Sequence, residues 1–206
     1  MCSETFLRLP EEKRNRFLDA AWEEFSRVPF TEASINKIVV RARIPRGSFY
    51  QYFTDKEELF LYLLGGMLNH FYAEYNKILA GFQGDIFQTQ LRCFDQVVQK
   101  KDLDPLFDRG LVILQQNPEF LVQIVVENQM GYGIWEAVQE HINLSAFRDV
   151  ETAKQTFMLS LMALAVAMRS GMMKPEQLDL CRRELAMRLE ILKNGSLAVQ
   201  PAKEAL

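Results

Sequence analysis

The sequence predicts an all-α protein, in which an N-terminal three-helix domain with a helix-turn-helix is fused through a long helix to a second helical domain. Apolar residues recur at the i, i+3, i+4, i+7 spacing of a helix face along most of the 206 residues. Proline, glycine and short polar clusters interrupt this pattern at intervals typical of helices. No strand-length run of alternating apolar and polar residues stands out.

The first helix is expected to begin near Pro10, which is followed by two acidic residues that suit a first helical turn. One face of this helix is apolar, and it carries the two bulky rings of Trp22 and Phe25. Pro29 ends the helix, because the residue before a proline is biased away from the helical conformation. These signals predict one helix of about five turns.

Two short helices and a long one are expected next. Ser34 is a favourable N-cap for the first of them, and a break follows around Arg43. The next short helix covers Pro45 to Tyr52, and Thr54 or the residue after it caps the long helix. Two short helices joined by a tight turn and framed by longer ones are a helix-turn-helix arrangement, here at about 34–53.

Later helices are expected at 85–101, 104–116, 118–141, 147–171 and 175–193, after a loop at 80–85, and the tail at 196–206 is expected to fray. The most apolar segment, Phe157 to Met168, is shorter than the roughly 20 residues that cross a bilayer. It is therefore interpreted as a buried helix, and no membrane partner is expected.

The second short helix carries the residue types that read DNA. Such a helix lies in the major groove with its N-terminal residues toward the base edges. Arg46 can reach guanine or a phosphate, and the absence of a side chain at Gly47 permits close approach. Ser48 and Gln51 can bond to a phosphate or a base edge. A lone surface arginine is more often merely solvated, so this pattern alone leaves a DNA-binding role and a purely structural role both open.

The aromatic residues of that helix divide into two groups. Phe49 and Phe53, four residues apart, are expected to face inward as core. Tyr50 and Tyr52 are expected to offer hydroxyls to phosphates while their rings stay half packed. Lys56, at the start of the long helix, is expected to add a phosphate contact beside the N–H groups of the helix end.

The stretch SINKIVVRARIPRGSFYQYFTDKEELF, from Ser34 to Phe60, resembles the DNA-binding region of the TetR family of bacterial transcriptional regulators. Many positions agree in order and spacing, and the match covers about the first 65 residues. Two positions depart from the family pattern: Arg43 stands at the turn where the family usually has glycine, and glycine is also common where Pro29 stands.

The resemblance implies a DNA-binding domain at 8–56 and a helical ligand-binding and dimerisation domain at 57–195. It also implies a homodimer that binds a near-palindromic, double-stranded operator and responds to a small-molecule effector. The DNA-binding residues that it implies, with those on the preceding helix placed at flanking phosphates, are Ser34, Lys37, Arg46, Gly47, Ser48, Tyr50, Gln51, Tyr52 and Lys56.

The second domain offers weaker signals for a ligand pocket. Two glycines in the segment NQMGYGIWEAV cost a helix about 1 kcal/mol each, which indicates a kink, close packing or a pocket wall. Most aromatic and methionine residues in such helices are ordinary core. The residues weakly favoured for the pocket are Phe71, Phe94, Asn128, Tyr132, Trp135 and Phe157.

The last two helices are the expected dimer surface. The final helix carries an apolar stripe formed by Leu178, Cys181, Leu185, Leu189 and Leu192. Two such helices from each subunit could form a four-helix bundle, although burial of the stripe within one monomer is the alternative. The resemblance favours the dimer.

Composition limits the other functions. Residues 1–56 hold ten Lys/Arg and eight Asp/Glu, whereas the whole chain has a net charge of −3, which permits a DNA-binding N-terminus. Three widely spaced cysteines fit a cytoplasmic protein. Neither histidine lies in a zinc motif, and no nucleotide-binding or hydrolase motif is present. We therefore expect that the protein binds no cofactor and no metal and is not an enzyme. The alternative is a helical small-molecule-binding or enzymatic domain without sequence-specific DNA binding.

Overall fold

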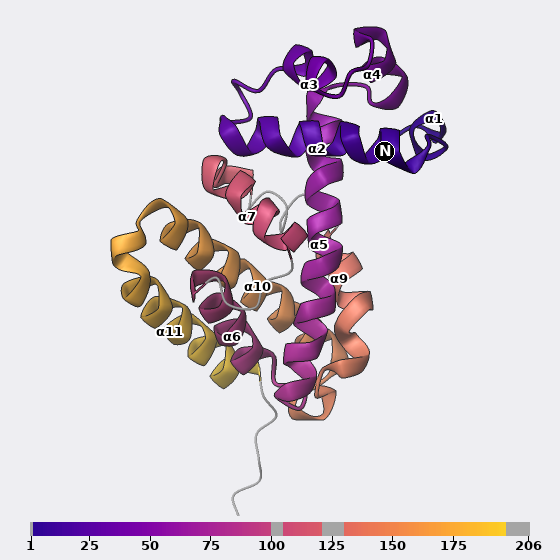
Figure 1. Ribbon diagram of the computed structural model, residues 1–206. Coiled ribbons are helices and arrows are strands. Elements are labelled where there is room, and N and C mark those ends of the chain that lie inside the picture. Colours follow the sequence, from indigo (N-terminus) through magenta and orange to yellow (C-terminus); the bar gives the residue numbers. More distant parts are fainter. Residues whose placement is uncertain (1, 100–104, 121–129, 197–206) are drawn as a thin grey trace, which may run out of the picture. The chain divides into compact units, whose positions relative to one another are not determined.

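The computed structural model describes residues 2–99, 105–120 and 130–196, and every regular element within those ranges is a helix (Figure 1). The chain divides into two compact units. The first contains the described residues of 2–71 and 105–117, and the second contains those of 72–99 and 118–196. The helix α5 (Lys56–Gly81) contributes residues to both units.

The first unit contains α1 (Glu4–Leu7), α2 (Glu11–Arg27), α3 (Ile35–Arg41), α4 (Arg46–Tyr52), the start of α5 and α7 (Pro105–Gln116). Its core is a cluster of phenylalanine rings. Phe17 stacks on Phe53 with ring centroids 5.9 Å apart, and Phe25 meets Phe60 edge-on at 5.0 Å. All four side chains are at most 1% exposed, so they fix α2, α4 and α5 against one another.

The helix α7 completes the first unit although it is distant in sequence. The Asn117 side chain, just beyond α7, accepts a hydrogen bond of 2.7 Å from the backbone N–H of Phe30. Arg109 pairs with Asp19 at 3.0 Å and lies over the Trp22 ring, with 5.4 Å from its guanidinium carbon to the ring centroid. These contacts hold α7 along α2.

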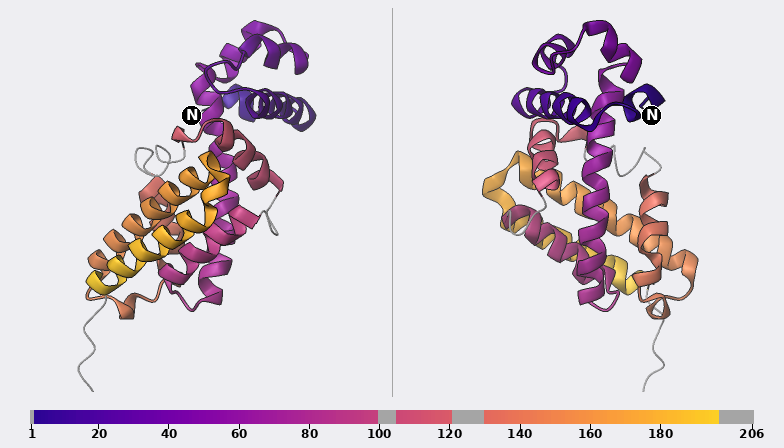
Figure 2. Two further views of the ribbon diagram at one scale, coloured as in Figure 1. Left: turned by 90° about the vertical axis from the view of Figure 1, so that its left-hand side faces the viewer. Right: turned by 45° about the vertical axis from the view of Figure 1, so that its right-hand side comes forward.

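The second unit contains the rest of α5, α6 (Ile86–Gln99), α9 (Met130–Val138), α10 (Val150–Met173) and α11 (Leu178–Ser196). The helices α6, α10 and α11 pack side by side (Figure 2). Arg182 of α11 bonds Asp95 of α6 through two nitrogen–oxygen contacts of 2.7 and 3.0 Å. Gln90 of α6 donates to Ser160 of α10 at 2.9 Å, entirely within the core.

Local signals placed both ends of α2, whereas part of the helix expected at 118–141 lies outside the described residues. The helix α2 begins after Pro10 and ends at Arg27, before Pro29, as expected. Asp149 caps α10 by accepting a hydrogen bond from the N–H of Thr152. Ser34 occupies the N-cap position of α3, but its side chain makes no capping bond. The sequence reasoning missed α1, which is only one turn long and has no apolar repeat.

The apolar helix α10 is long and apolar enough to cross a membrane by length and composition alone. Half of its most apolar window is buried inside the protein, where Phe157 and Leu164 are at most 2% exposed. The core helix of a soluble protein passes the same test, so this feature is weak evidence for a membrane span.

Candidate nucleic-acid interface

The turn between α3 and α4 has a defined geometry. Arg43 has a φ of 54°, in the left-handed region. Its N–H donates to the carbonyl of Val40 at 3.1 Å, and the N–H of Ile44 donates to the carbonyl of Val39 at 3.0 Å. These two bonds form a Schellman motif, and the side chains of Ile44 and Val39, at the positions of its usual apolar contact, are both buried. The motif fixes the direction in which the chain enters α4.

The helix α4 has one buried and one exposed face. Phe49 is fully buried, and Phe53, at the C-terminal cap, is 1% exposed. On the other face Arg46, Gly47 and Gln51 are exposed, and the Tyr50 side chain is 51% exposed, although its ring meets Phe49 edge-on at 5.2 Å. Ser48 is half-buried. The inward positions of Phe49 and Phe53 are confirmed, and the exposed face carries donors toward solvent.

The expectation of a half-packed Tyr52 ring is wrong. Tyr52 is 3% exposed, and its ring lies 5.7 Å from that of Phe6 and 5.8 Å from that of Phe17. Burial against α1 and α2 removes its ring from the exposed face of α4. The reason is long-range packing, which the helical spacing of Tyr50 and Tyr52 does not reveal.

Asn36 of α3 is a site residue that sequence reasoning missed. Its side-chain oxygen accepts a hydrogen bond of 2.7 Å from the guanidinium of Arg46, at the start of α4. Both side chains are exposed. The bond uses one of the five guanidinium donors, which leaves Arg46 oriented and able to bind further acceptors. No sequence signal pointed to this pair, since it depends on the turn geometry.

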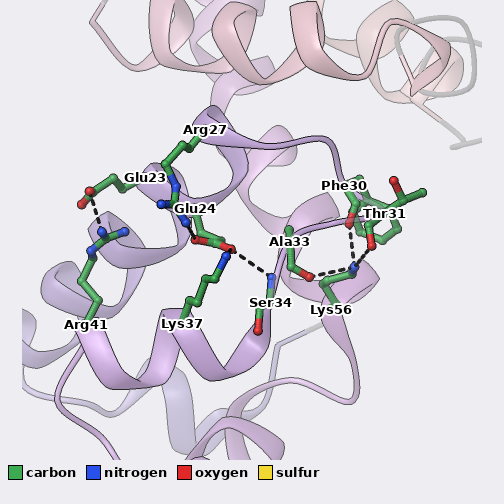
Figure 3. Close-up of polar contacts among 10 residues, drawn as sticks. All are labelled: Glu23, Glu24, Arg27, Phe30, Thr31, Ala33, Ser34, Lys37, Arg41 and Lys56. Carbon is green, nitrogen blue, oxygen red and sulfur yellow. Dashed lines mark hydrogen bonds and ion pairs between the residues drawn. The ribbon is translucent and has the colours of Figure 1, made fainter.

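A buried carboxylate joins α2 to the start of α3 (Figure 3). Glu24 is fully buried, and it accepts a hydrogen bond of 3.1 Å from the backbone N–H of Ser34. Arg27 donates to it at 2.8 Å, and the Lys37 ammonium lies 3.8 Å away. Glu24 thus satisfies the backbone N–H of the N-cap residue of α3, as the carboxylate of a capping box does, and charge-assisted bonds of this kind are the stronger ones.

Lys37 and Lys56 are placed differently from the expectation of phosphate contacts. The Lys37 side chain reaches toward Glu24 of α2, although it remains largely exposed. The Lys56 ammonium donates to the carbonyls of Phe30 at 2.6 Å, Ala33 at 3.0 Å and Thr31 at 3.4 Å (Figure 3). It therefore closes the loop between α2 and α3, and its hydrogen-bonding capacity is already used there.

The described residues among those favoured for a ligand pocket fall in both units of the structure. Phe71 belongs to the first unit, where it stacks on Phe107 at 5.6 Å. In the second unit Trp135 contacts Phe157 at 5.8 Å, and Phe157 also meets Tyr75. Asn128 and the Tyr132 side chain lie outside the described residues, and Phe94 is buried in α6.

The surroundings of the acidic, histidine and cysteine side chains bear on metal and thiol chemistry. No group of three or more His, Cys, Asp or Glu side chains that could hold a metal ion is present among the described residues. Burial raises the pKa of the Cys93 thiol to about 12, which keeps it protonated at neutral pH. Cys181 is also buried.

A tight Schellman turn joins two short helices, and the second helix exposes Arg46, Gly47, Tyr50 and Gln51. This arrangement defines a helix-turn-helix DNA-binding domain. Residues 17–63 match the sequence profile of bacterial regulatory proteins, tetR family. Over these residues the chain is therefore similar to the DNA-binding domain of TetR-family transcriptional regulators.

Solved structures share the fold. A transcriptional regulator from Rhodococcus sp. Rha1 aligns with a TM-score of 0.56 at 16% identity, over 90% of this chain and 98% of that one. SmeT, the repressor of the Stenotrophomonas maltophilia multidrug efflux pump SmeDEF, aligns with a TM-score of 0.55 at 15% identity, over 98% of each chain. No curated protein sequence matches this chain.

Proposed function

We propose that this regulator is a homodimeric repressor that a small-molecule ligand releases from near-palindromic operator DNA. The observation that carries the proposal is the division of α4 into a buried aromatic face and an exposed donor face. Arg46 and Gln51 would read base edges or bind phosphates, and Tyr50 would donate to a phosphate. Gly47 has no atom within 4 Å of an added Cβ, so it leaves open space at this face.

Each remaining contact has a different role. The half-buried Ser48 and the Ser34 hydroxyl, at the N-terminal ends of α4 and α3, would bind flanking phosphates. Lys37 would do so only by leaving Glu24, because its ammonium lies 3.8 Å from that carboxylate. Asn36 would orient Arg46. Two such helices in a dimer would lie about one DNA turn, roughly 34–36 Å, apart or somewhat farther.

The proposed dimer uses the last two helices. Apolar side chains that are 40–67% exposed recur along them at helical spacing. Exposed apolar groups of this extent mark interaction surfaces when they are contiguous. By contrast, the stripe residues Cys181, Leu185 and Leu189 are buried within the protomer, so the outward face is a different one. It is formed by Leu159, Met162, Val166, Met173, Leu180, Met187 and Ile191.

The proposed effector would bind in the helical domain, for which we keep the boundaries 57–195, with the DNA-binding domain at 8–56. Support comes from the aromatic surface of Trp135 and Phe157 in a helical core. Because α5 is continuous from Lys56 to Gly81, a ligand that shifts it would change the spacing of the two α4 helices. A coupling of about 1–3 kcal/mol would change operator occupancy 5–150-fold. A cytoplasmic location follows from this role.

Selection of duplexes from a random pool by the wild-type protein tests DNA recognition directly. We expect enrichment of one near-palindromic sequence. Fluorescence anisotropy with that duplex should show that Arg46→Ala and Tyr50→Ala each weaken binding by about 5- to 150-fold, since base and phosphate contacts contribute about 1–3 kcal/mol each. Arg92→Ala, which removes an exposed charge from α6, is the matched control and should bind normally.

The alternative is a helical small-molecule-binding or enzymatic domain without sequence-specific DNA binding. That alternative predicts no enriched sequence and equal affinities for all variants. Unchanged affinity of Arg46→Ala and Tyr50→Ala for an enriched duplex would instead overturn only the site assignment. Thermal-shift screening of small molecules, followed by anisotropy with each hit, tests whether a ligand releases the DNA.

A further inference from the structure

The segment that precedes the family match contacts the end of α4. Residues 3–7 lie outside the matched range of 17–63. The backbone N–H of Ser3 donates to the carbonyl of Tyr52 at 3.0 Å, and the Ser3 hydroxyl donates to the carbonyl of Gln51 at 2.6 Å. Both carbonyls belong to the last turn of α4, where a helix has no partners of its own for its carbonyls. Ser3 therefore caps α4 from a site 48 residues away in the sequence.

Phe6 anchors the same segment. Its side chain is fully buried, and its ring centroid lies 4.9 Å from that of Phe53 and 5.7 Å from that of Tyr52. It also contacts Phe17 of α2 at 5.8 Å and Tyr62 of α5 at 5.6 Å. One ring thus joins the C-terminal end of α4 to the two helices that carry it.

The segment owes its own structure to this docking. A helix of four residues is far below the length that is stable in water. Within α1 the Ser3 hydroxyl accepts a bond of 3.2 Å from the N–H of Phe6. The hydroxyl that closes α1 is therefore the one that donates to α4. The Ser3 hydroxyl oxygen therefore links the first turn of α1 to the last turn of α4.

We propose that Ser3 and Phe6 are positioning residues for DNA recognition, and that the contacts of these two residues hold α4 in its DNA-binding conformation. The inference rests on the proposed DNA-binding role of α4. With only seven residues, α4 depends on outside contacts for stability. Fraying from its C-terminal end would release Tyr52 and then Gln51 and Tyr50, and the last two residues are on the exposed face. Only the competent fraction of the protein would then bind the specific sequence.

Substitutions at Ser3 give the first test, with the duplex enriched by the wild-type protein as the probe. Ser3→Ala removes the bond to Gln51 and the cap of α1, and we expect operator affinity to fall by about three- to tenfold, as one such bond implies. Ser3→Thr keeps the hydroxyl and should restore most of the affinity. Leu7→Ala, at an exposed position of the same turn, is the matched control and should bind normally.

The discriminating measurement is affinity for a scrambled duplex at the same salt concentration. Non-specific binding depends on phosphate neutralisation, and Ser3→Ala changes no charge. We therefore expect the specific affinity to fall while the non-specific affinity stays unchanged. Equal losses on both duplexes would indicate a general loss of folded protein and would overturn the positioning role.

Hydrogen exchange of the Phe53 amide gives a second, independent readout. That amide donates to the carbonyl of Phe49 at 2.9 Å and reports closure of the last turn of α4. In the Ser3→Ala and Phe6→Leu variants this amide should exchange faster than in the wild-type protein, whereas amide exchange in the second unit should stay unchanged. Unchanged exchange and unchanged operator affinity would overturn the inference even if the wild-type protein binds DNA. If the wild-type protein enriches no sequence, the proposed function itself fails.

Discussion

Replacement of Arg43 by glycine should stabilise the protein, although arginine to glycine is usually destabilising. Arg43 has a φ of 54°, and its side chain is exposed. Non-glycine residues in the left-handed region cost roughly 1–2 kcal/mol. The added freedom of glycine in the unfolded chain costs roughly 0.5–1 kcal/mol in the opposite direction. The balance for Arg43→Gly is a gain of about 0–1.5 kcal/mol in the free energy of unfolding.

The gain in the free energy of unfolding requires that the turn between α3 and α4 keeps its conformation. The two hydrogen bonds of the Schellman motif come from the backbone N–H groups of Arg43 and Ile44, so they survive the substitution. No ion pair of the Arg43 side chain is present among the described residues. The substitution therefore relieves backbone strain and removes little else.

Urea unfolding measures the effect, with an unchanged m-value showing that only stability has changed. Gln83, with a φ of 53°, is the matched position in the second unit, and Gln83→Gly should shift the midpoint in the same direction. Gly84 has a φ of 82°, and a Cβ there would collide with the backbone of Asn143, so Gly84→Ala should destabilise. A lower midpoint for Arg43→Gly would refute the strain argument.

Three further predictions follow from buried or exposed groups. Glu24→Ala should lower the free energy of unfolding by about 2 kcal/mol, because a charge-assisted bond to the Ser34 N–H is lost. Glu24→Gln keeps an acceptor and should lower it by about half as much. Urea unfolding measures both variants, and equal losses would contradict this account. Cys93 should resist a thiol reagent in the native state at neutral pH, and fast modification of the folded protein would disprove this. Burial raises the pKa of Cys93 from 9.0 to about 12, so the stability that the neutral thiol contributes should be lost as pH rises through that range. Cys93→Ala should abolish this pH dependence. Met187→Glu should convert the proposed dimer to a monomer in analytical ultracentrifugation without loss of helicity, whereas Leu7→Glu, at an exposed apolar position of the first unit, should leave the dimer intact.

Sequence patterns predicted much of the helical framework because their signals are local. Proline, acidic first turns and apolar spacing placed α2 and α4, and the resemblance of the stretch that begins at Ser34 was confirmed by the family match. The inward faces of Phe49 and Phe53 also followed from their spacing of four residues. Each of these features depends on residues within one or two helical turns of each other.

The composition of the candidate site was decided by contacts between distant residues. Tyr52 is buried by Phe6, and the Lys56 ammonium is taken by carbonyls at 30–33. Asn36 enters the site through Arg46, which is ten residues away along the chain. The sequence contains all of these groups, but their partners are set by how the helices pack.

From the sequence alone it followed that this chain is helical, that it carries a helix-turn-helix and that Arg43 stands where glycine is usual. The packing of the helices was needed to show which donors of that motif remain exposed, that Arg43 adopts the left-handed conformation and that Ser3 caps the end of α4. Hydrogen bonds and ring contacts between residues that are tens of positions apart in the sequence depend on how the helices pack. Local helix propensity therefore does not predict them.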